Sequence, residues 1–516
     1  MHHTSQATPH VAGEDDYIKP RTTGKNITFI LIAGFGSFMF GYANNVVTGS
    51  LAQTSFINKF LSGSDADAVI GGILGGFLGG AFIGSLLQGW ISPRYGRKKT
   101  TALAAILLIV SGALMAGSVH VAMFILFRIV SGIGAGILTS NCPTYMSEIS
   151  PLHTRGALTG THGVGINVAY TMSSSIALGL NFIDHPYQWR LQFVIFTFFS
   201  ILLLLSLFLI PESPRWLVEK ERHEEALETL RTLHVGTDGH GERVVQAEMA
   251  LIRAQIEAES SESTSYWHIF ATPSLRKRAI CSIMIWLLNI GSGVLVIANL
   301  TPLIFGGLGY GQTIQLGLSV VWVFTSGVGS FINGFLLDRL GRRPLLLIGG
   351  FLVGAVLVIE ALLQKYYLGT TNKAGLNAAT GIFYAYVFFW ASFIDNTTYC
   401  YIPEIWPTHL RSKGSSIAYC AYYAVAIATS SPASQAFATI GYKYYFVFLG
   451  LCVVAIVYIF FVFPETNGLA LEEIGEKFGD VVEVHFRDVI GDNDSEQNQD
   501  KVAESQIETA GEKTAA

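Results

Sequence analysis

The sequence predicts an all-α membrane protein in which twelve transmembrane helices form two six-helix bundles related by an internal repeat. The chain of 516 residues is 51% hydrophobic and only 13% charged, whereas an average soluble domain is about 25% charged. Twelve of its segments reach the roughly 20 apolar residues that a helix needs to cross a bilayer. Three short motifs recur in the same order in both halves, which indicates a duplicated unit.

The twelve apolar segments divide six and six around a long polar stretch. They cover residues 27–49, 69–90, 101–119, 121–142, 157–180, 191–210, 277–300, 312–337, 344–364, 378–403, 414–437 and 442–463. The predicted parts are a cytoplasmic N-terminal tail (1–26), an N-terminal bundle (27–210), a cytoplasmic linker (211–275), a C-terminal bundle (276–463) and a cytoplasmic C-terminal tail (464–516).

Two regions outside the bundles have a composition of their own. Within the linker, residues 219–233 and 242–257 show the amphipathic spacing of short surface helices. The tail is acidic and rich in Gln, Ser and Asp, so it is expected to be disordered after about residue 480. The polar N-terminus is followed by an apolar run too long for a signal peptide, so none is expected.

The longest repeated motif reads Tyr-x-x-Glu-x-x-Pro-x-x-x-Arg and occupies residues 145–155 in the first half and 401–411 in the second. The other repeated pairs are residues 89–98 with 334–343 and residues 211–213 with 464–466. Each motif lies at the end of an apolar segment. In membrane proteins, such paired repeats flank a substrate path between them.

The basic residues indicate how the chain is oriented in the membrane. They cluster in the loops after the second, fourth, eighth and tenth apolar segments, and these loops lie on one side of the bilayer together with both termini. Lys and Arg in short loops mark the cytoplasmic side. Both termini are therefore expected to be cytoplasmic.

Several other classes of protein lack support in the sequence. The basic residues form short loop clusters and no continuous face, so nucleic acid is not an expected partner. The five cysteines form no CxxC pair, so neither a metal site nor a disulfide framework is expected. No nucleophile–base pair or phosphate-binding loop stands out, so the chain is expected to be neither an enzyme nor the carrier of a cofactor.

The motifs resemble those of the sugar porter family, which belongs to the major facilitator superfamily. The resemblance extends from about residue 27 to 480. Its five motifs are Gly89 to Lys98, Pro143 to Gly156, Pro211 to Arg215, Gly334 to Arg343 and Pro464 to Gly468. It implies a secondary transporter that moves a sugar or sugar-like small solute across the plasma membrane by alternating access. A nutrient sensor that uses the same fold without transport is the alternative.

The resemblance also implies a latch at the cytoplasmic ends of the helices. Its candidate residues are Arg94, Arg97, Glu148, Arg155, Glu212, Arg339, Arg342, Glu404, Arg411 and Glu465. Arginine forms directional, often bidentate pairs with carboxylates, and such pairs across the two bundles would hold this side closed. The alternative is that the arginines face only the anionic inner leaflet. Pro93 replaces the aspartate of the family pattern, whereas Asp338 keeps it, so the amino-terminal latch is expected to be weaker.

The substrate positions of the family are kept less well than its motifs. By resemblance, the candidate substrate-binding residues are His162, Asn289, Ser326, Tyr399, Tyr422 and Tyr423. A sugar site normally combines amides with an aromatic face, but this chain has fewer amides and more tyrosines. A hexose therefore competes with a less polar or aromatic solute, imported or exported, as the ligand. The tyrosines can also serve helix packing alone.

The proton acceptor that proton-coupled members carry in the first apolar segment is replaced by Ala43, whereas Arg128, its usual partner, is kept. Facilitated diffusion is therefore slightly favoured over proton symport. If protons are a partner, Asp395 is the candidate carrier, since an ionisable group deep in a membrane segment is functional by default. The alternatives are hydrogen bonding of Asp395 to its polar neighbours and snorkelling of Arg128 to the surface.

Overall fold

The computed structural model describes residues 24–479 with short gaps. The gaps are residues 64, 151–154, 184, 235–241, 257–265, 371, 408–409 and 468–470, together with several positions between 243 and 255. The described residues form helices joined by turns and contain no strand. Both the N-terminal tail before residue 24 and the tail expected to be disordered after about residue 480 lie outside the described residues.

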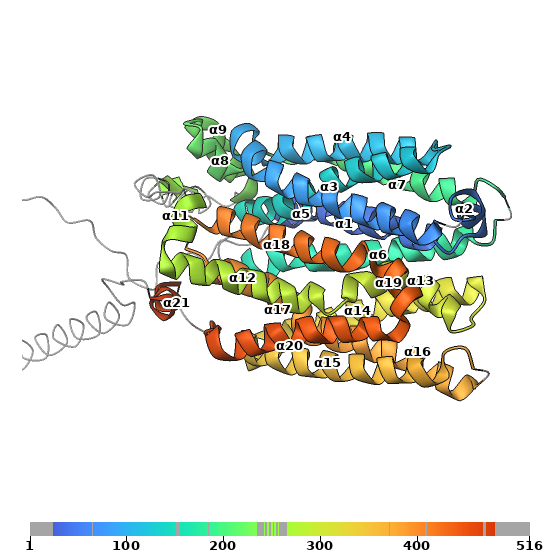
Figure 1. Cartoon of the computed structure of the whole chain (residues 1–516). Coiled ribbons are helices and arrows are strands. Elements are labelled where there is room, and N and C mark those ends of the chain that lie inside the picture. The colour runs from blue at the N-terminus through green and yellow to red at the C-terminus, as the bar shows by residue number, and fades with distance from the viewer. Residues whose placement is uncertain are drawn as a thin grey trace, which may run out of the picture. The chain divides into compact units, whose positions relative to one another are not determined.

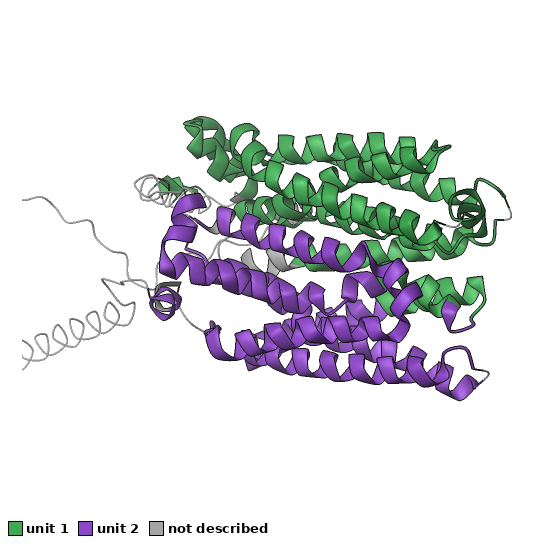
Figure 2. Cartoon of the chain, in the orientation of Figure 1, with its two compact units in different colours: residues 1–262, 298–306, 310–323 green, residues 263–297, 307–309, 324–516 purple. Residues whose placement is uncertain are grey.

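The chain divides into two compact units, which Figure 2 shows in separate colours. Unit 1 comprises residues 1–262, 298–306 and 310–323, and unit 2 comprises residues 263–297, 307–309 and 324–516. The seventh and eighth predicted spans are therefore shared between the units.

The helices of the first half run side by side in Figure 1. They are α1 (Gly24–Ser50), α2 (Thr54–Phe60), α3 (Ala66–Tyr95), α4 (Arg97–Ala116), α5 (Val121–Ile149), α6 (Arg155–Leu180), α7 (Gln188–Ser206), the 3-10 turn η3 (Leu207–Leu209), α8 (Pro214–Glu219) and α9 (His223–His234). The two short helices after η3 form part of the predicted linker. They pack through a small apolar core that includes Trp216, Leu230 and Val245.

The second half repeats this succession of long helices. It contains α11 (Tyr266–Ala271), α12 (Pro273–Gly291), α13 (Val294–Gly307), α14 (Gln312–Leu340), α15 (Arg342–Tyr367), α16 (Lys373–Trp390), the π-helix η4 (Ala391–Asp395), α17 (Asn396–Ile405), α18 (Arg411–Ser430), α19 (Ala433–Ile440), η6 (Gly441–Lys443), α20 (Tyr444–Val462) and α21 (Leu471–Phe478).

Each of the twelve predicted spans coincides with a helix or a pair of helices. By length and composition, ten helical stretches of the described residues can cross a membrane, and one of them, Lys413–Val462, contains the last two predicted spans. Helix α6, predicted as the fifth span, is not among the ten. Its many Gly, Ser and Thr residues make it more polar than its neighbours. The chain is therefore an all-α, multi-pass membrane protein.

Glycines allow α3 and α5 to approach each other closely. A Cβ atom at Gly80 would lie 2.1 Å from the carbonyl oxygen of Ile129, and one at Gly132 would lie 2.1 Å from that of Phe77. Side chains at these positions would therefore separate the helices. Small residues have this role in membrane helix pairs, and it accounts for part of the glycine-rich pattern in α3.

Two predicted spans contain an interruption that the apolar pattern did not reveal. The seventh divides into α12 and α13 around Gly293, whose φ of +88° lies outside the helical region. The tenth contains the π-helix η4 between α16 and α17. π-Helices occur often at functional sites, and η4 carries Asp395 at its end.

Candidate functional site

The start of α4 is built around an unusual backbone position and a carboxylate. Gly96 precedes the helix with φ +95° and ψ 164°, a conformation that is essentially confined to glycine. The Glu212 carboxylate then accepts hydrogen bonds from the backbone N–H groups of Arg97, at 2.9 Å, and Lys98, at 3.1 Å. Glu212 thus supplies acceptors for donors that have no partner within the first turn of a helix.

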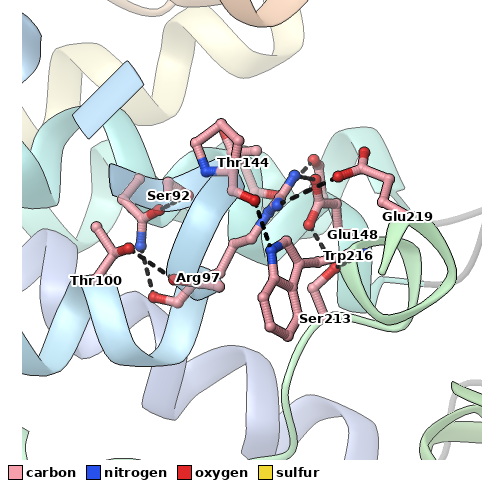
Figure 3. Close-up of polar contacts among 12 residues, drawn as sticks. Ser92, Arg97, Thr100, Thr144, Glu148, Ser213, Trp216 and Glu219 are labelled. Carbon is pink, nitrogen blue, oxygen red and sulfur yellow. Dashed lines mark hydrogen bonds and ion pairs between the residues drawn. The ribbon is translucent and has the colours of Figure 1, made fainter. Parts of the chain in front are cut away.

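Arg97 reaches from the same turn to a second carboxylate, as Figure 3 shows. Its Nη2 lies 2.8 Å from Oε1 of Glu148, while its Nη1 lies 3.9 Å from Oε2 of Glu219. The hydroxyl of Ser213 donates to the other oxygen of Glu148 at 2.5 Å. Burial raises the pKa of Glu219, although nearby Arg97 acts in the opposite direction. These contacts join α4, α5 and α8 into one charged cluster.

The second half repeats this cluster with equivalent residues. Glu465 accepts hydrogen bonds from the backbone N–H groups of Arg342 and Arg343, both at 2.9 Å. Arg342 forms a bidentate pair with Glu404, with distances of 3.2 Å from Nε and 2.9 Å from Nη2. Thr466 donates to Glu404 at 2.7 Å, as Ser213 does to Glu148. The repeat therefore extends to individual hydrogen bonds.

The tyrosine of the longest repeated motif has the same role in both halves. Tyr145 donates its hydroxyl to the carbonyl oxygen of Pro211, and Tyr401 donates to that of Pro464 at 3.1 Å. Both rings are almost completely buried. The hydroxyl contacts of these tyrosines and the roles of Ser213 and Thr466 were not predicted from the sequence. Their recurrence in both halves was the signal that would have found them.

The remaining latch candidates have other environments. Arg94 is exposed and places its guanidinium carbon 4.1 Å from the ring centre of Trp90. Arg339 is also exposed, and the side chains of Arg155 and Arg411 lie outside the described part. The ion pair of Arg97 with Glu148 joins α4 to α5 in the first half, and that of Arg342 with Glu404 joins α15 to α17 in the second half. Pairing across the halves stays a prediction.

The buried Arg128 lies on α5 among acceptors that are all uncharged. It donates from Nη1 to the carbonyl oxygen of Ala43 at 2.6 Å and from Nη2 to that of Asn44 at 3.1 Å. Its guanidinium carbon lies 4.1 Å from the ring centre of Phe77, a cation–π distance. The acceptors of these two hydrogen bonds are therefore uncharged backbone carbonyl oxygens.

His162 and Ser37 join α6 to α1 in the same unit. The imidazole Nδ1 of His162 lies 2.6 Å from Oγ of Ser37, and the His162 side chain is buried. Asn44 on α1 likewise donates to the hydroxyl of Tyr170 on α6 at 2.6 Å. The predicted substrate residue His162 therefore belongs to a polar seam between these two helices.

In unit 2, polar contacts gather around the π-helix. Asn289 donates to the hydroxyl of Thr398 at 3.1 Å, and its backbone oxygen accepts from Trp390 at 3.1 Å. Ser330 donates to a carboxylate oxygen of Asp395 at 3.2 Å. Asp395 is buried, so α12, α14 and the two parts of the tenth span are linked through polar side chains.

An aromatic cluster adjoins these polar contacts. The ring of Trp286 on α12 lies 5.4 Å from that of Tyr399 and 4.8 Å from that of Tyr422, measured between ring centres. Tyr423 contacts Tyr422 at 4.6 Å and has no exposed surface. The structure thus brings three predicted substrate tyrosines together around Trp286, which sequence reasoning missed although it lies one turn before Asn289.

Ser326 completes the set of predicted substrate positions. It is buried on α14, one turn before Ser330, the partner of Asp395. Asn289, Ser326 and the tyrosines belong to unit 2, whereas His162 belongs to unit 1.

Two sets of membrane helices with the same charged cluster at corresponding helix ends define a transporter of the major facilitator fold. The sequence profile described as "Sugar (and other) transporter" matches residues 29–478. The chain therefore belongs to this family of membrane transporters, whose members are not enzymes.

Known proteins similar to this chain include transporters from fungi. The protein described as MFS-type transporter criB of Aspergillus cristatus is 28% identical over 474 residues, which cover 92% of this chain and 97% of that protein. A high-affinity glucose transporter of Kluyveromyces lactis is 29% identical over 468 residues, covering 87% and 84% of the two chains.

A solved structure shares the fold. It is the proton:xylose symporter XylE bound to 6-bromo-6-deoxy-D-glucose, with a TM-score of 0.74 and 22% identity. The match covers 89% of this chain and 100% of that chain.

Proposed function

We propose that this protein is a secondary transporter that moves a sugar or sugar-like solute by alternating access and facilitated diffusion. The environment of Arg128 carries the proposal. Its Nη1 and Nη2 atoms donate to the carbonyl oxygens of Ala43 and Asn44, and its guanidinium carbon lies against the ring of Phe77. Ala43 cannot take up a proton, so binding and release of a proton at this position cannot drive the transport cycle.

The proposed sugar site is built mainly from residues of unit 2. Asn289 and Ser326 offer polar groups for hydroxyls, and the hydroxyls and rings of Tyr399 and Tyr422 offer hydrogen bonds together with a surface for the sugar ring. His162, which lies in unit 1, is a candidate substrate residue by the family resemblance alone. The glucose transport named for the relative from Kluyveromyces lactis supports a sugar as the ligand.

A second candidate solute is a less polar or aromatic metabolite, imported or exported. The aromatic cluster around Trp286 favours it, because Trp286 has Tyr399 at 5.4 Å, Tyr419 at 5.9 Å and Tyr422 at 4.8 Å. Stacking on such rings needs few hydroxyls on the ligand. Competition between a hexose and an aromatic acid for uptake distinguishes the two candidates.

Proton symport through a displaced acceptor is the competing mechanism. Asp395 is buried at the end of the π-helix and accepts a hydrogen bond from Ser330. A buried carboxyl group in a bilayer is costly to keep charged, which makes Asp395 the residue to test for a proton-carrying role. Arg128 is the second residue with a possible role in proton coupling.

The direct experiment is uptake by transporter-deficient cells from a panel of labelled sugars, polyols and aromatic acids, with and without a protonophore. We expect saturable uptake of a hexose that the protonophore leaves unchanged. Uptake that the protonophore abolishes both in the wild type and in Asp395→Asn would exclude facilitated diffusion and would also exclude Asp395 as the carrier. Failure of every solute to enter would favour export or a sensor.

The proposed placement is the plasma membrane, with both termini in the cytoplasm. The charged clusters of Arg97 and Arg342 would then lie on the cytoplasmic side. An epitope at the C-terminus is expected to be accessible to antibody in permeabilised cells and inaccessible in intact ones. Labelling of intact cells would reverse the orientation.

A further inference from the structure

A cavity of about 530 Å³ lies in unit 1 where the first turn of α4, the end of α7 and the surface helices α8 and α9 meet. Its lining residues include Lys98 and Lys99 from α4, Leu204 from α7, and Arg222 and Glu228 from the region of α9. The proposed transport path does not use this cavity.

One wall of the cavity is apolar and continues into the outer surface of the bundle. Ala102, Leu204, Leu207 and Phe208 form this wall. Phe208 is 79% exposed, and the neighbouring Leu209 is 67% exposed. Since α7 is a membrane-spanning helix, these side chains face the acyl chains of the bilayer near its boundary.

The cavity also has charged lining residues, and most of their charges have partners. Glu212 is bonded to the start of α4, and Glu225 forms a bidentate pair with Arg222, at 2.8 and 2.5 Å. The formal charges of the lining sum to zero, because three basic residues (Lys98, Lys99 and Arg222) face three acidic ones (Glu212, Glu225 and Glu228).

The lysines are placed to bind an anion. Lys98 donates one hydrogen bond to the carbonyl oxygen of Ile210 at 2.9 Å, and an ammonium group has three donors. Lys99 is exposed and has no carboxylate partner within the described residues. Because Glu212 and Glu225 already accept hydrogen bonds from the start of α4 and from Arg222, the two lysine ammonium groups are the cationic donors left for a phosphate.

We propose that this cavity binds one phospholipid from the adjacent leaflet. Its phosphate lies between Lys98 and Lys99, and one acyl chain follows the wall formed by Leu204, Leu207 and Phe208. A ligand with a phosphate and a long apolar chain matches both walls, whereas a free phosphate compound would leave the apolar wall uncovered. Lysines at a membrane boundary attract anionic lipid.

The cavity also touches the charged cluster at the start of α4. Glu212 and Trp216 line it, and Trp216 donates from its indole N–H to the carbonyl oxygen of Pro93 at 3.0 Å. A bound phospholipid would therefore hold α8 and α9 against the ends of α3 and α4. Binding is expected to raise the thermal stability of the protein, because a ligand of the folded state stabilises it.

The test uses the full-length protein, purified in detergent and delipidated, with dioleoyl phosphatidylglycerol as the probe. Native mass spectrometry measures lipid binding, and thermal unfolding measures its effect. Two partial ligands serve as controls: dioleoylglycerol, which lacks the phosphate, and glycerol phosphate, which lacks the acyl chains. We expect the complete phospholipid to bind and to raise the Tm, and neither control to do so at the same concentration.

Substitutions locate the site. Lys98→Gln with Lys99→Gln is expected to weaken binding roughly 25-fold, since each lysine near a membrane surface contributes about five-fold. Lys365→Gln with Lys443→Gln removes the same charge elsewhere and is expected to leave binding unchanged. Thr232→Trp, at an exposed lining position, is expected to fill the cavity and prevent binding while both lysines remain.

Lys99→Gln alone tests the charge without affecting the Lys98 hydrogen bond, and we expect it to lose about five-fold. Unchanged lipid affinity in the double lysine variant and in Thr232→Trp would overturn the proposal. An equal loss of lipid affinity in the two double lysine variants would also overturn it, because binding would then depend on the net charge of the protein and not on this cavity. Equal stabilisation by glycerol phosphate would replace the lipid with a soluble phosphate ligand, and equal binding of dioleoylglycerol would remove the role of the phosphate.

Discussion

Glu404 and Glu148 occupy the same place in the two halves, and each is held by an arginine and a hydroxyl. In the second half, both oxygens of Glu404 are used by Arg342, and one of them also accepts from Thr466. Charge-assisted pairs of this kind are strong and directional. The geometry supports a role in fixing the ends of α15 and α17 relative to each other.

Glu404→Gln is expected to leave the amount of protein in the membrane near normal and to reduce uptake about ten-fold or more. Glutamine keeps the size of the side chain but loses a charged hydrogen-bond partner, which contributes roughly 1.5–3 kcal/mol. The measurement is initial uptake per molecule of surface protein, with the exposed Glu476→Gln as the control for loss of one charge. Normal uptake by Glu404→Gln would remove this cluster from the transport cycle.

Gly341→Ala is expected to destabilise the protein by about 1–3 kcal/mol, because Gly341 has φ +86° and ψ 166°, a region that is strained for other residues. The added Cβ would also lie 2.9 Å from a carboxylate oxygen of Glu465. Thermal unfolding in detergent checks this expectation. Gly381→Ala, in an open position of α16, is the matched control and should not lower the Tm.

At the residue scale, sequence reasoning reached the charged motifs but not all of their contacts. The fixed spacing predicted that Arg97, Arg342, Glu148 and Glu404 lie at helix ends. It could not predict which neighbouring helix each side chain faces, because that depends on helix rotation and packing. Trp286 was missed for the same reason, since a tryptophan in an apolar segment looks like any other packing residue.

Among the helices, the interrupted seventh and tenth spans carry two of the proposed substrate residues. Asn289 lies near the end of α12, just before the break at Gly293, and Tyr399 follows the π-helix on α17. Hydrophobicity over about 20 residues identifies a span but averages over one irregular turn. The sequence therefore predicted the spans well, whereas the interruptions became visible only in the structure.

Cysteine labelling tests whether these helix segments line the substrate path. Tyr399→Cys and Asn289→Cys are expected to react with a small hydrophilic thiol reagent, and the substrate should slow each reaction. The partly exposed Cys400 and Cys420 are first replaced by serine, while the buried Cys452 serves as the unreactive control. Two unreactive and unprotected cysteines would show that neither position faces the path.

For the whole molecule, the duplicated motifs and the twelve apolar segments were enough to predict the fold class. The repeat is seen again in the structure, where Glu212 and Glu465 bind equivalent backbone groups in the two halves. Proton coupling is harder to predict, because it depends on one buried charge and its partner. By the family resemblance, Ala43 stands where proton-coupled members carry their proton acceptor. One such substitution removes the acidic partner of Arg128 and leaves the apolar pattern of the helix unchanged.

Ala43→Asp is expected to place a carboxylate beside Arg128 and to make uptake depend on external pH. The Nη1 atom of Arg128 already lies 2.6 Å from the carbonyl oxygen of Ala43, so an acidic side chain at this position has a cation close by. Uptake by Ala43→Asp is compared with that by Ala43→Asn, which adds similar volume without a charge. An identical pH profile for both variants would contradict the proposed role of this position.

Purified protein in liposomes gives the most direct test of transport without proton coupling. A pH gradient, acidic outside, is imposed on liposomes that hold the same concentration of labelled hexose inside and outside. We expect the internal concentration to stay equal to the external one, while the hexose still exchanges through the protein. Accumulation of hexose that follows the gradient and collapses with a protonophore would show proton-coupled transport instead.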